Sequence, residues 1–216
     1  KFEQSKDLFK IVLQSVDRLN HVIHPMLNYL NTEETYNFKP FNIIKIISDI
    51  VILSKANCNS KQIKIEVLDK LNQGVVYGDS KAIGQVFINL ITNAIDAIGN
   101  SGGKITIECI NEVFIYQGET KQGVKINIID NGCGMEEEKI KQIFVPFESS
   151  KNTKVNVGLG LSIVSKIIQD HRGLIKINSK PNEGTIISIF LQTTTESPKV
   201  NQKDKLFNLE SDFFED

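Results

Sequence analysis

Apolar and polar residues recur with two different periods along the chain, and the period changes between segments. In residues 1–34, apolar residues are spaced alternately by three and four. This heptad pattern predicts one long helix of a coiled coil or helical bundle, bent or broken near Pro25. Because one amphipathic helix cannot bury its apolar stripe alone, we expect it to form a homodimer with a second copy of the chain. Packing of this helix on the chain's own globular domain is the alternative.

Between residues 41 and 191 the chain alternates between helical and extended patterns. Apolar residues at helical spacing predict helices over 41–57, 81–98 and 160–170. Apolar residues on alternate positions predict strands over 104–110 and 124–130, and further strands are predicted over 64–70, 174–179 and 185–191. Helices and strands mixed in this way predict an α/β two-layer sandwich with a mixed sheet. His171, in "DHRG", is expected to lie in a loop.

These patterns divide the chain into a helical segment over residues 1–36, an α/β domain over 37–192 and a polar stretch over 193–216. The polar stretch has little periodicity, which is typical of a linker or disordered tail. Its last residues, "LFNLESDFFED", interleave aromatic and acidic side chains, so a docking segment is the alternative.

Charge and composition exclude several classes of function. The net charge of -1 indicates neither a nucleic-acid footprint nor contact with a membrane surface. No apolar stretch is long enough to span a bilayer, so we expect a cytoplasmic protein, with a membrane anchor upstream still compatible with the sequence. The three cysteines lie far apart, without the CxxC spacing of a zinc site, and predict no disulfide framework.

The helix predicted over 81–98 carries polar residues on one stripe. Asn89, Asn93 and Asp96 are spaced by four and three residues, so they share a face. Asparagine is a mediocre helix former, and two of them one turn apart indicate a function. A carboxamide oxygen is a suitable ligand for Mg²⁺, which takes its other ligands from water and phosphate. A solvated helix surface is the alternative.

The stretch "IIDNGCGM" ends a predicted strand with a carboxylate. If Asp130 is buried there, an exocyclic amine such as that of adenine would satisfy it. Gly132 and Gly134 would let a planar ring approach the backbone. A simple turn that requires positive φ angles is the alternative.

Two more segments complete the candidate site. In "NVGLGLSIV", Gly158 and Gly160 precede a predicted helix, whose free backbone N–H groups suit a triphosphate. In "NEGTIISIFL", Thr185 begins a strand, where its hydroxyl could bond the edge of an adenine.

Four motifs in this order, "NLITNAIDA", "DNGCGM", "FVPFESSK" and "GLGL", resemble the N box, first glycine box, F box and second glycine box of sensor histidine kinases. That family shares the Bergerat ATP-binding fold with gyrase. The resemblance covers residues 41–191, and the helix predicted in residues 1–36 further resembles part of the family's dimerisation and phosphotransfer domain. The resemblance implies catalysis by Asn89 and Asn93, with Mg²⁺ bound by Asn93. It implies ATP binding by Asn89, Asn93, Asp96, Asp130, Gly132, Gly134, Lys151, Gly158, Leu159, Gly160, Leu161 and Thr185.

The sequence departs from the family pattern in two places. Asn156 and Val157 replace the glycine and threonine of a "GTGLGL" motif, and the phosphoacceptor motif "H-E-x-x-N-P" is absent. His21 and His24 lie outside the heptad stripe and lack the acid that follows the acceptor in the family. We therefore expect the acceptor histidine upstream of this chain.

The resemblance predicts a histidine kinase that uses Mg-ATP and passes the phosphoryl group to an aspartate of a response regulator. A hydrolytic ATPase related to gyrase is disfavoured, because those enzymes have a glutamate base where this chain has Asn89. A nucleotide-binding scaffold without catalysis, or a serine kinase, is the remaining alternative.

Overall fold

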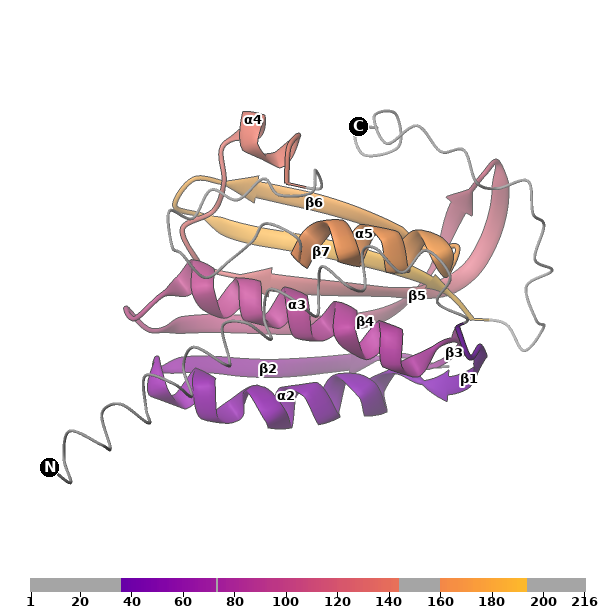
Figure 1. The fold of residues 1–216 in the computed structure, drawn as a ribbon, viewed down its shortest axis with the longest axis horizontal. Coiled ribbons are helices and arrows are strands. Elements are labelled where there is room, and N and C mark those ends of the chain that lie inside the picture. The colour runs from indigo at the N-terminus through magenta and orange to yellow at the C-terminus, as the bar shows by residue number, and fades with distance from the viewer. Residues whose placement is uncertain (1–35, 73, 144–159, 194–216) are drawn as a thin grey trace, which may run out of the picture.

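The computed structural model describes residues 36–72, 74–143 and 160–193, which form two layers (Figure 1). One layer is a five-stranded sheet, and helices α2, α3 and α5 cover one of its faces. In chain order the elements are β1 (Lys39–Asn42), α2 (Ile43–Ser60), β2 (Ile63–Lys70), β3 (Val75–Gly78), α3 (Ser80–Ile98), β4 (Gly103–Tyr116), β5 (Glu119–Asp130), α4 (Glu137–Ile140), α5 (Gly160–Asp170), β6 (Leu174–Lys180) and β7 (Gly184–Gln192).

The large sheet has the strand order β2-β4-β5-β7-β6. β2 and β4 are parallel, and every other neighbouring pair is antiparallel. A parallel pair needs a crossover connection, and here that connection contains α3, the middle helix of the covering layer. The predicted α/β two-layer sandwich with a mixed sheet is therefore confirmed.

The core lies between the sheet and the helices. Alternate residues of each strand face the helix layer, and the register aligns them in rows across the sheet. One such row consists of Val67, Ile107, Ile128, Ile187 and Ile177. Each fully buried isoleucine contributes about 1.5–3 kcal/mol relative to an exposed one. The alternation is clearest in β4 and β5, whose apolar residues face the helices at every second position.

Polar caps fix where the two long helices begin. The Asn42 side chain accepts hydrogen bonds from the backbone N–H groups of Ile44 and Lys45, at 2.9 and 3.2 Å. Asp79 caps α3 in the same way through Lys81 and Ala82. Such caps satisfy N–H groups that have no partner inside the helix. The cap at Asn42 explains why α2 begins two residues later than its apolar pattern predicts.

Three features of the fold were not predicted from the sequence. The short strands β1 and β3 pair in a separate two-stranded sheet, and α4 is a single turn. Strands β4 and β5 also continue past their predicted ends to a two-residue turn at Gln117 and Gly118, where both φ angles are positive. This conformation suits a tight hairpin. The paired strands β4 and β5 are therefore longer than their apolar alternation indicates.

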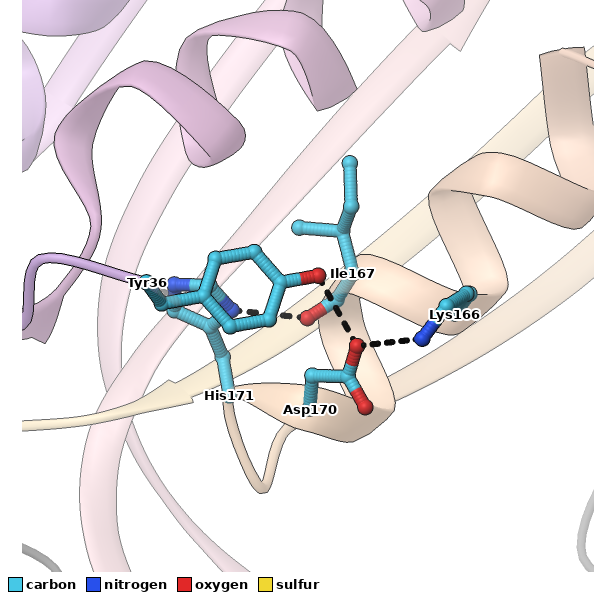
Figure 2. Close-up of polar contacts among 5 residues, drawn as sticks. All are labelled: Tyr36, Lys166, Ile167, Asp170 and His171. Carbon is cyan, nitrogen blue, oxygen red and sulfur yellow. Dashed lines mark hydrogen bonds and ion pairs between the residues drawn. The ribbon is translucent and has the colours of Figure 1, made fainter. Parts of the chain in front are cut away.

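His171 lies at the C-terminal end of α5, where its ring packs against that of Tyr36, the first described residue (Figure 2). Its Nδ1 atom lies 2.8 Å from the carbonyl oxygen of Ile167, and its Nε2 atom accepts a hydrogen bond from the backbone N–H of Asp79. Beside it, the Tyr36 hydroxyl donates to Asp170, which also pairs with Lys166. The residue does lie in the turn after α5, as expected, but it is only 6% exposed.

Several predictions concern residues outside the described ranges. These are the heptad helix with His21 and His24, the phenylalanine-containing motif with Lys151, the glycine Gly158 with Leu159, and the polar tail. The division of the chain into three parts therefore stays a prediction. Of the helices within the described ranges, none combines the length and hydropathy that a bilayer crossing requires.

Candidate functional site

A polar row ends the apolar face of the sheet. Asp130 is paired in register with Thr185, and Thr185 with Ser179, across β5, β7 and β6. These three residues face the helix layer, as do the isoleucines of the preceding row. Asp130 and Thr185 are 7% and 6% exposed. The polar row therefore forms a nearly buried floor at one end of the sheet.

The Asp130 carboxylate accepts fewer hydrogen bonds from the described residues than its oxygens allow. One of its oxygens accepts a hydrogen bond of 2.8 Å from the backbone N–H of Gly132. Burial raises the pKa of the Asp130 carboxyl, and the N–H groups of Gly132 and Thr185 oppose this rise. A carboxylate offers about four lone-pair positions, so this one can accept further hydrogen bonds from a ligand. An amino group on a planar base is a suitable donor.

The glycines after Asp130 are required by the protein itself. A Cβ atom on Gly132 would lie 2.7 Å from the carbonyl carbon of Ala97 in α3. Gly134 has a φ of 64°, and a Cβ there would overlap the carbonyl oxygen of Lys180. The sequence predicts that these glycines let a planar ring approach the backbone. The structure adds a second reason, because the loop is packed between α3 and the turn that joins β6 to β7.

The polar stripe of α3 divides between two neighbours. Asn89 uses both ends of its carboxamide: its Oδ1 accepts from Gln85 at 3.2 Å, and its Nδ2 donates to the carbonyl of Gly160 at 3.4 Å. Asp96 instead pairs with Lys61, which follows α2, at 3.3 Å. Asn89 thus contacts the first residue of α5, and Asp96 contacts the opposite neighbour of α3.

Asn93 lies between these two residues and has a different environment. Its side chain is half-buried, and no hydrogen bond joins it to the part of the chain that the structure describes. Its Nδ2 atom would lie 3.9 Å from a Cβ on Gly160. Since no described residue occupies this carboxamide, it can bind a ligand or a metal ion beside the start of α5.

Mg²⁺ fits this arrangement, because it binds few protein groups and retains water and phosphate oxygens. Asn93 is the residue that would hold it. Within the described ranges, no three His, Cys, Asp or Glu residues are grouped closely enough to form an all-protein metal site.

The first turn of α5 places backbone N–H groups at the candidate site and apolar side chains against the core. Gly160 is its first residue and is half-buried, while the Leu161 side chain packs against the core. Helix N-termini favour anions because their first N–H groups lack partners.

The two halves of the site are joined through α3. The backbone N–H of Cys133 donates to the carbonyl of Ala97 at 3.0 Å, one turn after Asn93 on the same helix. This bond holds the loop after Asp130 against the helix that carries Asn93. The structure thus brings Asp130, Thr185, Asn93 and Gly160 to one end of the domain.

The region that carries the candidate site matches a known protein family. A profile of the family described as "Histidine kinase-, DNA gyrase B-, and HSP90-like ATPase" matches residues 78–195. The chain belongs to this ATPase family. The matched residues include the four segments that carry the candidate site residues: α3, the loop after β5, the start of α5, and β7.

Individual members of the ATPase family are also similar. Sporulation kinase C of Bacillus subtilis is 31% identical over 91% of this chain and 44% of its own length. The catalytic domain of histidine kinase ThkA has a TM-score of 0.60 and 30% identity over 72% of this chain and 95% of that domain. The structure of ThkA in complex with the response regulator protein TrrA has a TM-score of 0.68 and 28% sequence identity, over 90% of this chain and 53% of that one. The chain thus spans less than half the length of sporulation kinase C.

Three residues that support the site were not found by sequence reasoning. Gln85 positions Asn89, Lys61 pairs with Asp96, and Ser179 bonds Thr185. Gln85 could have been found, because it lies four residues before Asn89 on the same stripe. Ser179 is the polar end of an otherwise apolar alternation in "LIKINS". Lys61 carries no such signal.

Proposed function

We propose that this protein is the core of a sensor histidine kinase that binds Mg-ATP in this site. The observation that carries the proposal is the buried floor of Asp130 and Thr185. It lies at the same end of the domain as the Asn93 carboxamide, which has no hydrogen-bond partner among the described residues. Asp130 would accept the adenine amine, and Thr185 would lie at the same base edge. Gly132 and Gly134 would lie below the ring.

The phosphates would occupy the other half of the site. Asn93 would hold Mg²⁺, which neutralises phosphate charge when it is bound. The backbone of the segment Gly158–Leu161 would contact the phosphates, with Lys151 nearby. Asn89, which bonds Gly160, would position the start of α5 for this contact. We assign Asp96 to anchoring α3 through Lys61, one turn beyond the proposed metal ligand.

In the proposed reaction, the bond between the γ-phosphorus and its bridging oxygen to the β-phosphate breaks. A bond between that phosphorus and a histidine nitrogen forms, ADP leaves, and the imidazole proton passes to a base. Positioning and electrostatic stabilisation dominate such transfers. Hydrolysis is disfavoured, because the carboxamide of Asn89 is engaged with Gln85 and Gly160 and cannot act as a base.

Calorimetry of nucleotide binding tests the site directly. Asn93→Ala should weaken Mg-ATP binding at least about tenfold, while ATP in EDTA binds almost as it does to the unchanged protein. Thr92→Ala is the matched control, because Thr92 is the exposed neighbour on α3 and should change neither affinity. An equal loss of affinity with and without Mg²⁺ would show that Asn93 does not bind the metal. Absence of any adenine-nucleotide binding by the unchanged protein would refute the proposed function.

The chemistry is tested with γ-labelled ATP and the full-length protein. Label that is lost in acid and retained in base indicates phosphohistidine, whereas acid-stable label indicates a serine kinase. ThkA is known in complex with a response regulator, so we propose a receiver aspartate as the next acceptor. Transfer of the label to a purified receiver domain would support that partner.

The assembly and its compartment are also proposals. We infer a homodimer formed by the heptad segment of residues 1–36, with the kinase reaction in the cytoplasm, where ATP is available. Sedimentation of the full-length protein and of a variant with charged residues at Val12 and Leu19 tests the dimer. A dimer that persists in the variant would place the contact elsewhere.

A further inference from the structure

Ser179 connects the proposed base-binding floor to the turn between β6 and β7. Its Oγ atom donates a hydrogen bond of 2.8 Å to the carbonyl oxygen of Gly184. The same Oγ lies 2.9 Å from Oγ1 of Thr185. Thr185 is in turn the register partner of Asp130 in β5. One strand, β7, therefore separates Ser179 from the Asp130 carboxylate, and Ser179 contacts Thr185 in that strand.

The number of available protons determines the direction of the second hydrogen bond. A hydroxyl group has one hydrogen to donate, and a carbonyl oxygen can only accept. Because Ser179 donates its hydrogen to Gly184, it can only accept from Thr185. The Thr185 hydroxyl must then donate to Ser179, and its remaining lone pairs can only accept from a ligand.

We propose that Ser179 is a specificity-determining residue that makes the floor of the nucleotide site a pure acceptor surface. Asp130 and Thr185 then both present acceptors to the same edge of the base. Such a surface favours a 6-amino purine, which offers N–H donors there, over a 6-oxo purine, which offers a carbonyl oxygen. This inference rests on the proposed function and deepens it, because it concerns how that site selects its nucleotide.

Ser179 acts through Thr185 and is a positioning residue. Without the serine hydroxyl, the Thr185 hydroxyl can rotate and donate its hydrogen to a carbonyl oxygen of the ligand. Asp130 still disfavours that carbonyl, so selection is reduced and not abolished. One misplaced hydrogen bond corresponds to about a tenfold change in affinity.

The test compares dissociation constants for Mg-ATP and Mg-ITP, which differ at the 6-position of the purine. We expect Ser179→Ala to reduce the preference for ATP about tenfold, mainly through tighter ITP binding. Ser179→Thr retains the hydroxyl and should retain the preference. Ser188→Ala is the matched control, because Ser188 is a β7 hydroxyl that bonds Asn127 and faces away from the helix layer.

If Ser179 has only a structural role, Ser179→Ala would weaken the binding of both nucleotides equally. The ratio of their dissociation constants would then be unchanged, and this outcome would overturn the inference. If Ser179→Ala does not fold, Ser179→Cys provides the same comparison, since a thiol is a weak acceptor. Loss of selectivity in the Thr variant would also contradict the proposal. If the unchanged protein binds neither nucleotide, the proposed function fails first, which distinguishes the two failures.

Discussion

The backbone N–H of Asp79 donates a hydrogen bond of 2.9 Å to Nε2 of His171. An acceptor at Nε2 requires that this nitrogen carry no proton, so Nδ1 carries it and donates to the carbonyl of Ile167. The imidazole is therefore neutral and joins two segments. One is the start of α3, which carries the polar stripe, and the other is the end of α5, which begins beside Asn89.

Protonation of His171 should destabilise the fold. Burial lowers the pKa of His171 from 6.5, and the carboxylates of Asp79 and Asp170 oppose this shift only in part. The unfolded chain therefore binds a proton more readily than the folded one, and stability is lost as the pH falls below about 6.5. We expect a lower free energy of unfolding at pH 5.5 than at pH 7.5, measured with urea.

A variant identifies the histidine responsible. In His171→Gln the part of this pH dependence that comes from the buried imidazole should disappear, although the variant is less stable at both pH values. Asp79 does not confuse the result. Burial alone would raise the pKa of the Asp79 carboxyl. The backbone N–H groups of Ala82, Asn37 and Lys81 donate hydrogen bonds to it and hold this pKa below 3.8, so Asp79 titrates below the pH range of the experiment. An unchanged slope in the variant would remove His171 from the explanation.

Gly134→Ala should destabilise the domain strongly. The position has a positive φ, and a Cβ there would overlap the Lys180 carbonyl oxygen, so the backbone must shift. We expect a loss of about 3 kcal/mol or more. Gly118→Ala is the control, with a φ of 78° but no atom within 4 Å of the added Cβ, and should cost only about 1 kcal/mol. Equal losses, measured by urea denaturation, would show that packing against Lys180 is unimportant.

The ion pair between Lys61 and Asp96 is expected to stabilise α3 without binding nucleotide. Both side chains are partly exposed, so Asp96→Asn and Lys61→Met should each cost less than about 1 kcal/mol. Their effects on Mg-ATP affinity should be equally small. A tenfold loss of affinity in Asp96→Asn alone would show that Asp96 belongs to the nucleotide site itself.

Cys133 provides a chemical probe of the same site. It lies between Gly132 and Gly134 and is exposed, whereas Cys58 and Cys109 are buried. Burial raises the pKa of the Cys109 thiol to about 12 and also raises that of Cys58, which makes both poor nucleophiles at neutral pH. Iodoacetamide should therefore modify Cys133 first.

Nucleotide should protect that thiol. If the base binds beside the loop of Gly132–Gly134, saturating Mg-ATP should slow the alkylation of Cys133 several-fold, as followed by mass spectrometry. Mg²⁺ alone is the control and should leave the rate unchanged. A rate that is independent of nucleotide would indicate that no base lies against this loop.

Much of the fold could be predicted because its signal is local. The alternation in "VKINIID" places Asp130 on the same face as Ile126 and Ile128, and the register confirms that face. The helical spacing after Lys81 predicts α3 to within one residue of its start. Each of these predictions uses residues within one element, where the period alone decides which side chains are buried.

The features that were missed depend on contacts between distant segments. β1 and β3 are four residues each, too short to show a period, and they form only because they pair with each other. The burial of His171 depends on Tyr36, Phe38 and Tyr77, whose rings lie around it or next to one another. The two hydrogen bonds of Asn89 likewise involve a neighbouring turn and another helix. No single stretch of sequence carries these relationships.

The order of strands in the sheet has a consequence for how the protein is made. The hairpins β4–β5 and β6–β7 join neighbouring segments, whereas Asp130 meets Thr185 only when β5 pairs with β7. Contacts between remote segments form slowly, because closing a long loop has an entropic cost. A nascent chain on the ribosome therefore lacks the pairing of Asp130 with Thr185 until β7 has been synthesised and has docked beside β5.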